Sequence, residues 1–551
     1  MLSTNRVRSA SVEVNAKGET AAGGSASVDD WWRHGVVYQI YPRSFQDASG
    51  DGVGDLPGIL QRLDHLNDGT PESLGVDAVW LSPFYASPMV DFGYDVADHC
   101  DVDPLFGTLA DFDDLVDACH RRGIRVVVDF VPNHTSDRHP WFLESRSSRS
   151  SPKRDWYIWA DPSADGGPPN NWLSEFPLEG SPVPAWTFDQ ATGQFYLHSF
   201  LPQQPDLNWL NPEVRRAMTD VLRFWLDRGV DGFRIDAVQR IGHDPDLRDN
   251  VDGEPRRDED LDVAREVVRE FRRVLDSYEA KMAVGEVYLL DIERWIRYYG
   301  DRGDGFHLVF NFSFLRQPWR ARAFRNAAER FESLLPPGAW PDYTLSNHDH
   351  PRAVTRYDRG RPGSPRARVG AMMLLTLRGT PFLYYGEEIG MADIPVPPER
   401  SQDPGGRDPC RTPMRWEPGR TAAFTTGEPW LPVGDPDEGN VEAQRADPSS
   451  MLSLYRSLIW LRRRSSALRW GSFRPRDAGR DVFAYERESQ DERLFVALNF
   501  SERSHAVSAD PLPSHGVLES STDPARAPGQ VSLHPLGLGP LEGVIVRIEP
   551  G

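Results

Sequence analysis

Short apolar runs alternate with longer amphipathic segments along most of this chain, beginning near residue 36. The apolar runs have the length of buried strands, and the segments between them carry apolar residues at the spacing of one helix face. Helical spacing is clearest over residues 56–66, 111–121, 212–228 and 261–275. Eight strand and helix repeats predict an α/β fold, a (β/α)8 TIM barrel, rather than an open doubly wound sheet. The eight apolar runs cover residues 36–41, 78–81, 125–131, 232–238, 282–287, 307–312, 343–346 and 381–385.

The alternation breaks in two places. About 80 residues rich in Pro, Asn, Trp and Ser separate the third apolar run from the helix near Pro212. A loop of that length without structure is uncommon in a compact domain, so residues 133–207 are predicted to form a small inserted domain. Residues 395–448 are dense in Pro, Gly and Asp and are predicted to form an irregular segment at the barrel mouth. The barrel then comprises residues 29–132 and 208–465.

The two ends of the chain differ in character from the barrel. A helical pattern over residues 451–464 is followed by short alternating runs, which predict a C-terminal antiparallel β-sandwich over residues 466–551. Residues 1–28 consist largely of Ser, Ala, Gly and charged residues, with no apolar stretch of the kind a secretory signal needs. We therefore expect a flexible tail and a cytoplasmic location.

Composition narrows the classes of function. The chain has 551 residues, of which 39% are hydrophobic and 26% charged, and no apolar run approaches the roughly 18 residues that a membrane helix needs. A formal charge of −21 opposes attraction to nucleic acid and to anionic lipid, so neither is expected as a partner. Three cysteines without CxxC spacing favour reduced thiols over a disulfide framework or a zinc site.

Three of the predicted strands end in an acidic residue: Asp236, Glu286 and Asp349 follow them. Barrel enzymes keep their catalytic groups at the carboxyl ends of the strands, so these acids are expected to meet in one active site. Arg234 stands two residues before Asp236 and faces the same side of its strand, which keeps Asp236 ionised. Glu286 has fewer cationic neighbours in the sequence, so its protonated form is expected nearer to neutral pH.

One ionised and one protonated carboxyl are what the cleavage of a glycosidic bond requires. The alternative is that Arg234 and Asp236 form a structural ion pair without catalytic meaning, since such pairs also occur at strand ends. The position of the acids at the catalytic face of a barrel favours the first interpretation.

Several ordered motifs make the chain similar to the α-amylase family of retaining glycoside hydrolases, and in particular to its α-glucosidase and oligo-1,6-glucosidase branch. The resemblance covers about residues 30–551. One motif marks this branch and lies at the end of the inserted segment, over residues 204–208 (QPDLN). The others are residues 129–134 (DFVPNH), 232–238 (GFRIDAV), 285–288 (GEVY) and 347–349 (NHD).

The resemblance implies a role for each matching residue. Asp236 is expected to be the nucleophile, Glu286 the acid/base and Asp349 the residue that stabilises the distorted sugar. Ala237 matches a position at which a small residue goes with α-1,4 bonds and Val with α-1,6 bonds. The residues expected to hold the nonreducing glucose are Tyr94, Asp95, His134, Arg234, His348 and Arg411.

These expectations define an exo-acting α-glucosidase that releases glucose from maltose-like α-1,4-glucosides by double displacement, with some transglucosylation. Trehalose synthase or a sucrose-isomerising enzyme is an alternative within the same chemistry, because a sugar hydroxyl then replaces water. An inactive relative that binds sugars or a protein partner is an alternative of another class. That reading expects a membrane anchor and lost acids, and neither is found. The sequence does not indicate an oligomeric state.

A possible metal loop precedes the first helix, over residues 47–55. Oxygen donors at relative positions 1, 3, 5, 7 and 9, with Gly52 at position 6, follow the logic of a calcium loop. Gly58 stands where an EF-hand has its bidentate Glu, so this is no EF-hand. The resembled branch often holds Ca²⁺ in such a loop, and a structural Ca²⁺ is expected in preference to a plain acidic turn. Its ligands would be Asp47, Ser49, Asp51, Asp55 and the carbonyl oxygen of Val53.

Overall fold

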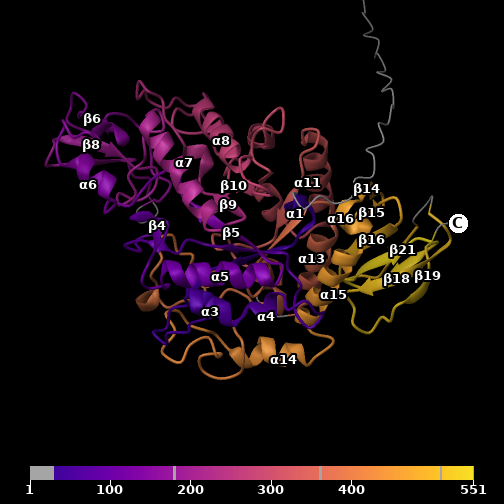
Figure 1. The fold of residues 1–551 in the computed structure, drawn as a ribbon. Coiled ribbons are helices and arrows are strands. Elements are labelled where there is room, and N and C mark those ends of the chain that lie inside the picture. The colour runs from indigo at the N-terminus through magenta and orange to yellow at the C-terminus, as the bar shows by residue number, and fades with distance from the viewer. Residues whose placement is uncertain (1–29, 178–180, 359–362, 509–511, 550–551) are drawn as a thin grey trace, which may run out of the picture.

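The computed structural model describes residues 30–177, 181–358, 363–508 and 512–549. The predicted tail, residues 1–28, lies outside these described residues. Figure 1 shows three parts: a central α/β body, a small lobe at the upper left around β6, β8 and α6, and a C-terminal sheet at the right.

Eight parallel strands form the central sheet, in the order β11-β10-β9-β5-β2-β1-β13-β12. Each predicted apolar run overlaps one of these strands, and the predicted barrel fold is confirmed. Most observed strands are shorter than the apolar runs, because the chain turns into loops at the carboxyl ends. The strands are β1 Val37–Ile40, β2 Ala78–Leu81, β5 Arg125–Phe130, β9 Gly232–Ile235, β10 Met282–Gly285, β11 Leu308–Val309, β12 Asp342–Thr344 and β13 Thr380–Tyr384.

Helices cover the outside of this sheet (Figure 1). Their first turns carry the expected caps: Thr108 and Asp111 form a capping box at α5, and Asn211 caps α7 ahead of a proline. Such caps satisfy the N–H groups that have no partner within the helix. The main helices are α3 Leu56–Gln61, α4 Leu63–Leu66, α5 Leu109–Arg121, α7 Pro212–Asp227, α8 Asp262–Leu275, α11 Ala321–Leu334, α13 Pro365–Thr376 and α15 Met451–Arg464.

Alternation along the strands divides the core into an inner and an outer layer. In β2, Ala78 and Trp80 point into the barrel, whereas Val79 and Leu81 pack outward against the helices. In β5 the inward position after Val127 is the buried Asp129. The inward positions therefore change from apolar to charged toward the carboxyl ends of the strands.

The inserted segment forms a small antiparallel sheet, in the order β6-β8-β7, with its own apolar cluster that includes Trp172 and Trp186. It contacts the loop after β9: Trp172 Nε1 donates to the carbonyl of Arg248 at 3.1 Å, and Asn170 Nδ2 donates to that of Leu247 at 3.0 Å. The lobe therefore lies against one side of the barrel mouth. Its elements are α6 Pro140–Arg146, β6 Trp159–Ala160, β7 Trp186–Asp189 and β8 Gln194–Leu197.

The C-terminal part is an antiparallel sheet of six strands, β14-β15-β16-β21-β18-β19, faced by a pair of strands, β17 and β20. Alternate residues of β15 face opposite sides: Val482 and Ala484 join the core under the small pair, while Phe483 and Tyr485 join the main core of the barrel. The face of the sheet that points toward the barrel is therefore covered by barrel helices and not by a second sheet. The strands are β14 Ser472–Arg476, β15 Val482–Glu488, β16 Arg493–Asn499, β17 His505–Val507, β18 His515–Ser521, β19 Gly529–Ser532, β20 Leu536–Leu538 and β21 Gly543–Arg547.

The segment 395–448 consists mainly of loops, with short 3-10 turns and one five-residue helix, α14 Val441–Arg445. Cys100, Cys119 and Cys410 are all free thiols. Within the described ranges, no helix combines the length and apolar character needed to cross a bilayer.

Candidate active site

A cavity of about 380 Å³ opens at the carboxyl ends of the barrel strands. Its wall combines carboxyl groups, arginines and aromatic rings, a mixture suited to a polar ligand with apolar faces. Residues from the barrel loops, the inserted lobe and the irregular segment all contribute. They are Asp91, Tyr94, His134, Glu175, Phe176, Phe200, Asp236, Ala237, Gln239, Glu286, Tyr288, Arg316, Asp349, His350 and Arg407.

The guanidinium of Arg234 stands below the cavity and is shared by three acids. Its Nη1 lies 2.5 Å from Oδ1 of Asp129 and 2.6 Å from Oδ1 of Asp236, and its Nη2 lies 2.7 Å from Oε2 of Glu286. The strand pairing explains this convergence, because Asp129 of β5 is paired with Arg234 of β9 and β9 is paired with β10. Three neighbouring strands thus direct their last inward side chains at one point.

The expectation that Glu286 has few cationic neighbours is wrong, since Arg234 contacts it as closely as it contacts Asp236. The reason is that β9 and β10 are adjacent, so an inward guanidinium on one reaches the acid that follows the other. The backbone N–H of Ala237 also donates to Oε2 of Glu286, at 3.1 Å. This N–H group is positioned by the left-handed backbone at Ala237, which has a φ of 45°. The same turn ends β9 earlier than the predicted run.

The two acids nevertheless have different proton affinities. Burial raises the pKa of Asp236 to about 6, against the opposing effect of Arg234. Burial raises the pKa of Glu286 further, to about 8, and the neighbouring Asp236 adds to that rise. A hydrogen bond from Glu286 lowers the pKa of Asp236. Near neutral pH the site therefore holds an ionised Asp236 beside a protonated Glu286.

Asp349 completes the acidic part of the wall and is the strongest acid of the three. Burial, which raises its pKa, is outweighed by cationic neighbours, so the pKa of Asp349 lies below its usual range. Arg407 Nη1 and Arg411 Nη2 lie 3.0 and 3.2 Å from its Oδ1. His348 lies near the other oxygen, but burial lowers the pKa of His348 well below its usual value, so the arginines supply the positive charge.

Of the residues expected to hold a sugar, Tyr94 and His134 line the cavity, whereas Arg234 and His348 lie directly behind the wall. The Tyr94 hydroxyl is 2.5 Å from His348 Nε2, and Gln39 Nε2 is 2.8 Å from His348 Nδ1. The buried histidine therefore fixes the tyrosine that the cavity exposes.

Asp95 does not line the cavity, and Asp91 takes the place predicted for it. The carboxylate of Asp95 accepts hydrogen bonds from the backbone N–H groups of Val90 and Asp91 and from the Ser87 hydroxyl. These donors turn it into the loop, where it holds the backbone that presents Asp91. Both acids belong to one five-residue segment, and the sequence offers no signal that separates their roles.

Arg411 likewise lies behind the wall, fully buried, where its Nε donates to the carbonyl of His348 at 2.8 Å. Arg407 is the arginine that reaches the cavity, and it was not predicted. Its Nη2 lies 2.6 Å from Asp91 Oδ1 and 2.7 Å from Asp403 Oδ1. Arg407 therefore joins Asp91 to Asp349 across the wall.

The proposed metal loop lies apart from the cavity. Asp47 accepts the N–H groups of Gly50 and Gly52, at 2.7 and 2.8 Å, and Asp55 accepts that of Gly58 at 2.7 Å. Gly52 has a φ of 95°, as the sixth position of such a loop requires. The all-oxygen donor set suits a hard cation, but in the described ranges no three acidic, His or Cys side chains form a group that could hold a metal ion. Ser49 and Asp51 would have to turn inward to complete a site.

A barrel with two adjacent carboxyls of unequal acidity at its carboxyl end defines a glycoside hydrolase. The family model described as "Alpha amylase, catalytic domain" matches residues 39–471. The chain belongs to the α-amylase family.

Named relatives align over nearly the whole chain. A "Probable alpha-glucosidase" of Rhizobium meliloti is 42% identical and covers 90% of this chain and 94% of its own length. An "Oligo-1,6-glucosidase" of Parageobacillus thermoglucosidasius is 39% identical, with 89% and 93% covered. Among solved structures, the "alpha-glucosyl transfer enzyme, XgtA" is 40% identical, with a TM-score of 0.83 over 94% of this chain and 99% of that one.

The raised pKa of Asp236 predicts that this acid costs stability at neutral pH. The folded-state pKa of Asp236, about 6, lies above the usual 3.8. The stability that its protonated form contributes to the fold is therefore fully present below pH 3.8 and is lost as the pH rises through 6. Asp236→Asn should therefore raise the melting temperature relative to the native protein at pH 8 and not near pH 4.

Scanning calorimetry at both pH values measures this difference. Asp220→Asn, at an acid of α7 that is 63% exposed, serves as the control and should show no such pH dependence. A lower melting temperature of Asp236→Asn than of the native protein at pH 8 would show that the charge on Asp236 does not destabilise the fold, and would contradict the prediction.

Proposed function

We propose that the protein is a retaining, exo-acting α-glucosidase that releases glucose from the nonreducing end of maltose-like α-1,4-glucosides. The observation that carries the proposal is the pair formed by Asp236 and Glu286, two acids of different pKa on one guanidinium. Both acids contact the same guanidinium, Asp236 at 2.6 Å and Glu286 at 2.7 Å, so they lie close together, as the two carboxyls of a retaining enzyme do. A cavity of about 380 Å³ suits a short saccharide, and the names of the relatives agree with glucosides as substrates.

The proposed reaction has two steps. The ionised Asp236 attacks the anomeric carbon while Glu286 gives its proton to the departing glycosidic oxygen, which leaves a glucosyl ester on Asp236. Glu286, now ionised, takes a proton from water, whose oxygen attacks the same carbon and releases Asp236. Asp349 faces the same cavity with its charge fixed by Arg407 and Arg411, and it is placed to stabilise the positive charge that develops on the sugar.

Transfer to a sugar hydroxyl is the second candidate, as in a trehalose synthase or a sucrose-isomerising enzyme. The relative named as an α-glucosyl transfer enzyme favours it. The aromatic side chains of Phe176, Phe200 and Tyr288 line the cavity together with Tyr94, and apolar walls there would exclude water from the glucosyl ester. Free glucose as the main product from maltose supports hydrolysis, whereas trehalose from maltose or isomaltulose from sucrose supports isomerisation.

The side chain of Ala237 lines the cavity, so its size is expected to influence the choice of linkage. We predict that the native enzyme has a higher kcat/KM for maltose than for isomaltose, and that Ala237→Val reduces or reverses this ratio. A valine adds two methyl groups beside Glu286, although its branched side chain is strained at a φ of 45°. The measurement is a product profile on maltose, isomaltose, sucrose and maltotriose.

Ala237→Ser is the matched control, because it nearly keeps the volume of alanine and should keep the preference for maltose. Faster hydrolysis of isomaltose by the native enzyme would refute the proposed linkage. The inactive Asp236→Asn variant should lose turnover by several orders of magnitude on every substrate, which tests the nucleophile separately.

The pH dependence follows from the same two acids. Activity requires Asp236 ionised, so kcat/KM should rise as the pH increases through about 6. It also requires Glu286 protonated, so kcat/KM should fall as the pH increases through about 8. Initial rates from pH 4 to 10 should give a bell-shaped profile with its maximum near the middle of that interval. Glu286→Gln should remove the alkaline limb from the residual activity, and an unchanged limb would assign it to another group.

We also propose that the loop formed by Asp47, Ser49, Asp51, Val53 and Asp55 binds a structural Ca²⁺, supported by its oxygen donors and by the conformation of Gly52. Adding Ca²⁺ to chelator-treated protein should raise the melting temperature, because a ligand at 100 times its dissociation constant stabilises the folded state by roughly 2.7 kcal/mol. Asp51→Asn should weaken this effect. No change with millimolar Ca²⁺, or an equal change with Mg²⁺, would remove the proposal. The three free thiols support a reducing, cytoplasmic location as part of the same proposal.

A further inference from the structure

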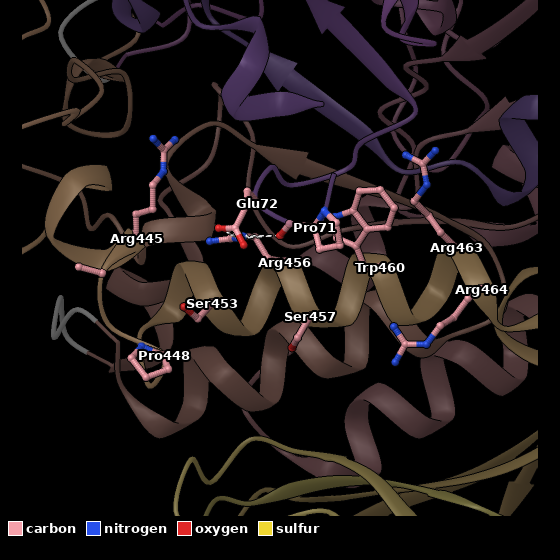
Figure 2. Close-up of a pocket in the computed structure, with 11 residues that line it drawn as sticks. Pro71, Glu72, Arg445, Pro448, Ser453, Arg456, Ser457, Trp460, Arg463 and Arg464 are labelled. Carbon is pink, nitrogen blue, oxygen red and sulfur yellow. Dashed lines mark hydrogen bonds and ion pairs between the residues drawn. The ribbon is translucent and has the colours of Figure 1, made fainter. Parts of the chain in front are cut away.

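The groove that runs along the outer face of α15 is the feature that the catalytic function leaves unused (Figure 2). Its volume is about 860 Å³, and none of its lining residues belongs to the catalytic cavity. One wall comes from the loop between α4 and β2, which lies at the amino ends of the barrel strands, opposite to the catalytic end. The groove is therefore a separate site.

Helical periodicity explains why this face of α15 is open. Ser453, Arg456, Trp460 and Arg463 follow one another at spacings of three, four and three, so they share one side of the helix, with Ser457 beside them. The opposite side is apolar and buried in the core of the protein. Its members include Leu454, Leu458, Ile459 and Leu461.

The charge of the groove is opposite to that of the protein. The chain carries a formal charge of −21, yet the groove is lined by four arginines and a single acid, Glu72. Glu72 is paired with Arg456 at 2.7 Å, as the dashed line in Figure 2 shows. The remaining arginines are Arg445, Arg463 and Arg464.

Two of these arginines have no side-chain partner anywhere in the described ranges. Arg445 of α14 and Arg464 at the end of α15 are both exposed and take part in no ion pair or side-chain hydrogen bond there. They stand at opposite ends of the groove in Figure 2. Each guanidinium keeps five N–H donors for a ligand, and guanidinium groups bind phosphate in bidentate fashion.

The wall that faces these arginines is held rigidly. Arg456 donates through Nε and Nη2 to the carbonyl of Pro71, at 2.9 and 2.6 Å, and Arg463 donates through Nη1 to that of Gly75 at 2.6 Å. Trp460 Nε1 donates to the carbonyl of Ser73 at 3.1 Å. Both guanidinium groups also pair with an acid, Arg456 with Glu72 at 2.7 Å and Arg463 with Asp77 at 3.6 Å. The uncompensated positive charge of the groove is therefore that of Arg445 and Arg464.

The dipole of α15 accounts for part of this pattern, since cations are favourable in the last turn of a helix. It explains Arg463 and Arg464, and the dipole of α14 explains Arg445 in the last turn of that helix. Arg456 lies in the second turn of α15 and is compensated by Glu72. Helix dipoles do not explain why the ends of two helices meet at one groove.

We propose that this groove binds an inorganic polyphosphate chain long enough to pass from Arg445 to Arg464. An α-helix rises about 1.5 Å per residue, so Ser453 and Arg464 alone stand about 16 Å apart along α15, which a triphosphate does not span. Arg445 and Arg464 would supply the unpaired donors at its two ends, and Arg463 the donors between them. The net negative charge of the protein repels such anions at long range, so binding must come from the local cluster. The proposal is independent of the substrate of the catalytic cavity.

Isothermal titration calorimetry of the full-length protein with a medium-chain inorganic polyphosphate tests this site, at constant ionic strength. Arg445→Ala together with Arg464→Ala should weaken binding by at least roughly tenfold, because each lost charge-assisted contact is substantial. Both residues are exposed, so the fold and the hydrolysis of glucosides should remain unchanged. The matched control is Arg121→Ala together with Arg322→Ala, two exposed arginines elsewhere, which should bind as the native protein does.

Tripolyphosphate should bind more weakly than the longer chain, because it cannot reach Arg445 and Arg464 together, and equal affinity of the two would overturn the proposal. No heat with millimolar polyphosphate, or equal weakening in the control variant, would overturn it as well. A change of oligomeric state in the double variant without any change in polyphosphate binding would also overturn it, in favour of an acidic surface on a second copy.

Discussion

The guanidinium of Arg234 is the group on which the chemistry of this protein depends. It is the positive charge shared by three buried acids, Asp129, Asp236 and Glu286, and it lies within 2.7 Å of all of them. One cation cannot compensate three anions that are largely shielded from water. One acid must therefore keep its proton near neutral pH, and Glu286 has the highest pKa of the three. The difference in acidity between Asp236 and Glu286 follows from this shortage of positive charge.

The fold was predictable because its signal repeats: an apolar run overlaps each barrel strand, and Asp236 and Glu286 follow their strands directly. The contact between Arg234 and Glu286 could also have been foreseen, since successive strands of a barrel are neighbours. The exchange of Asp95 for Asp91 could not. Both acids lie in one tight segment with a left-handed Phe92, and the direction of each side chain depends on hydrogen bonds within that loop. Arg407 was missed because the path of an irregular segment leaves no periodic trace in the sequence.

Buried and exposed arginines serve different purposes in this chain. In the active site, Arg234, Arg407 and Arg411 are each engaged by carboxylates, which fixes both partners and sets the acidity of the wall. On the far side of the barrel, Arg445 and Arg464 form no ion pair with any of the residues that the structure describes. The first arrangement stabilises charges that the protein itself supplies, whereas the second leaves positive charge available to a ligand.

One face of the C-terminal sheet packs directly on the barrel, so the two parts depend on each other for their burial. Phe483 and Tyr485 lie in the same apolar cluster as the barrel helices, and Arg487 donates to the carbonyls of Thr376 and Leu468 across the boundary. Separation of the sheet would expose both rings and leave these carbonyls without their donor. The last 80 or so residues therefore support the barrel and are not an exchangeable module. Recombination at this boundary would expose apolar surface on both fragments and would not give two independently folded domains.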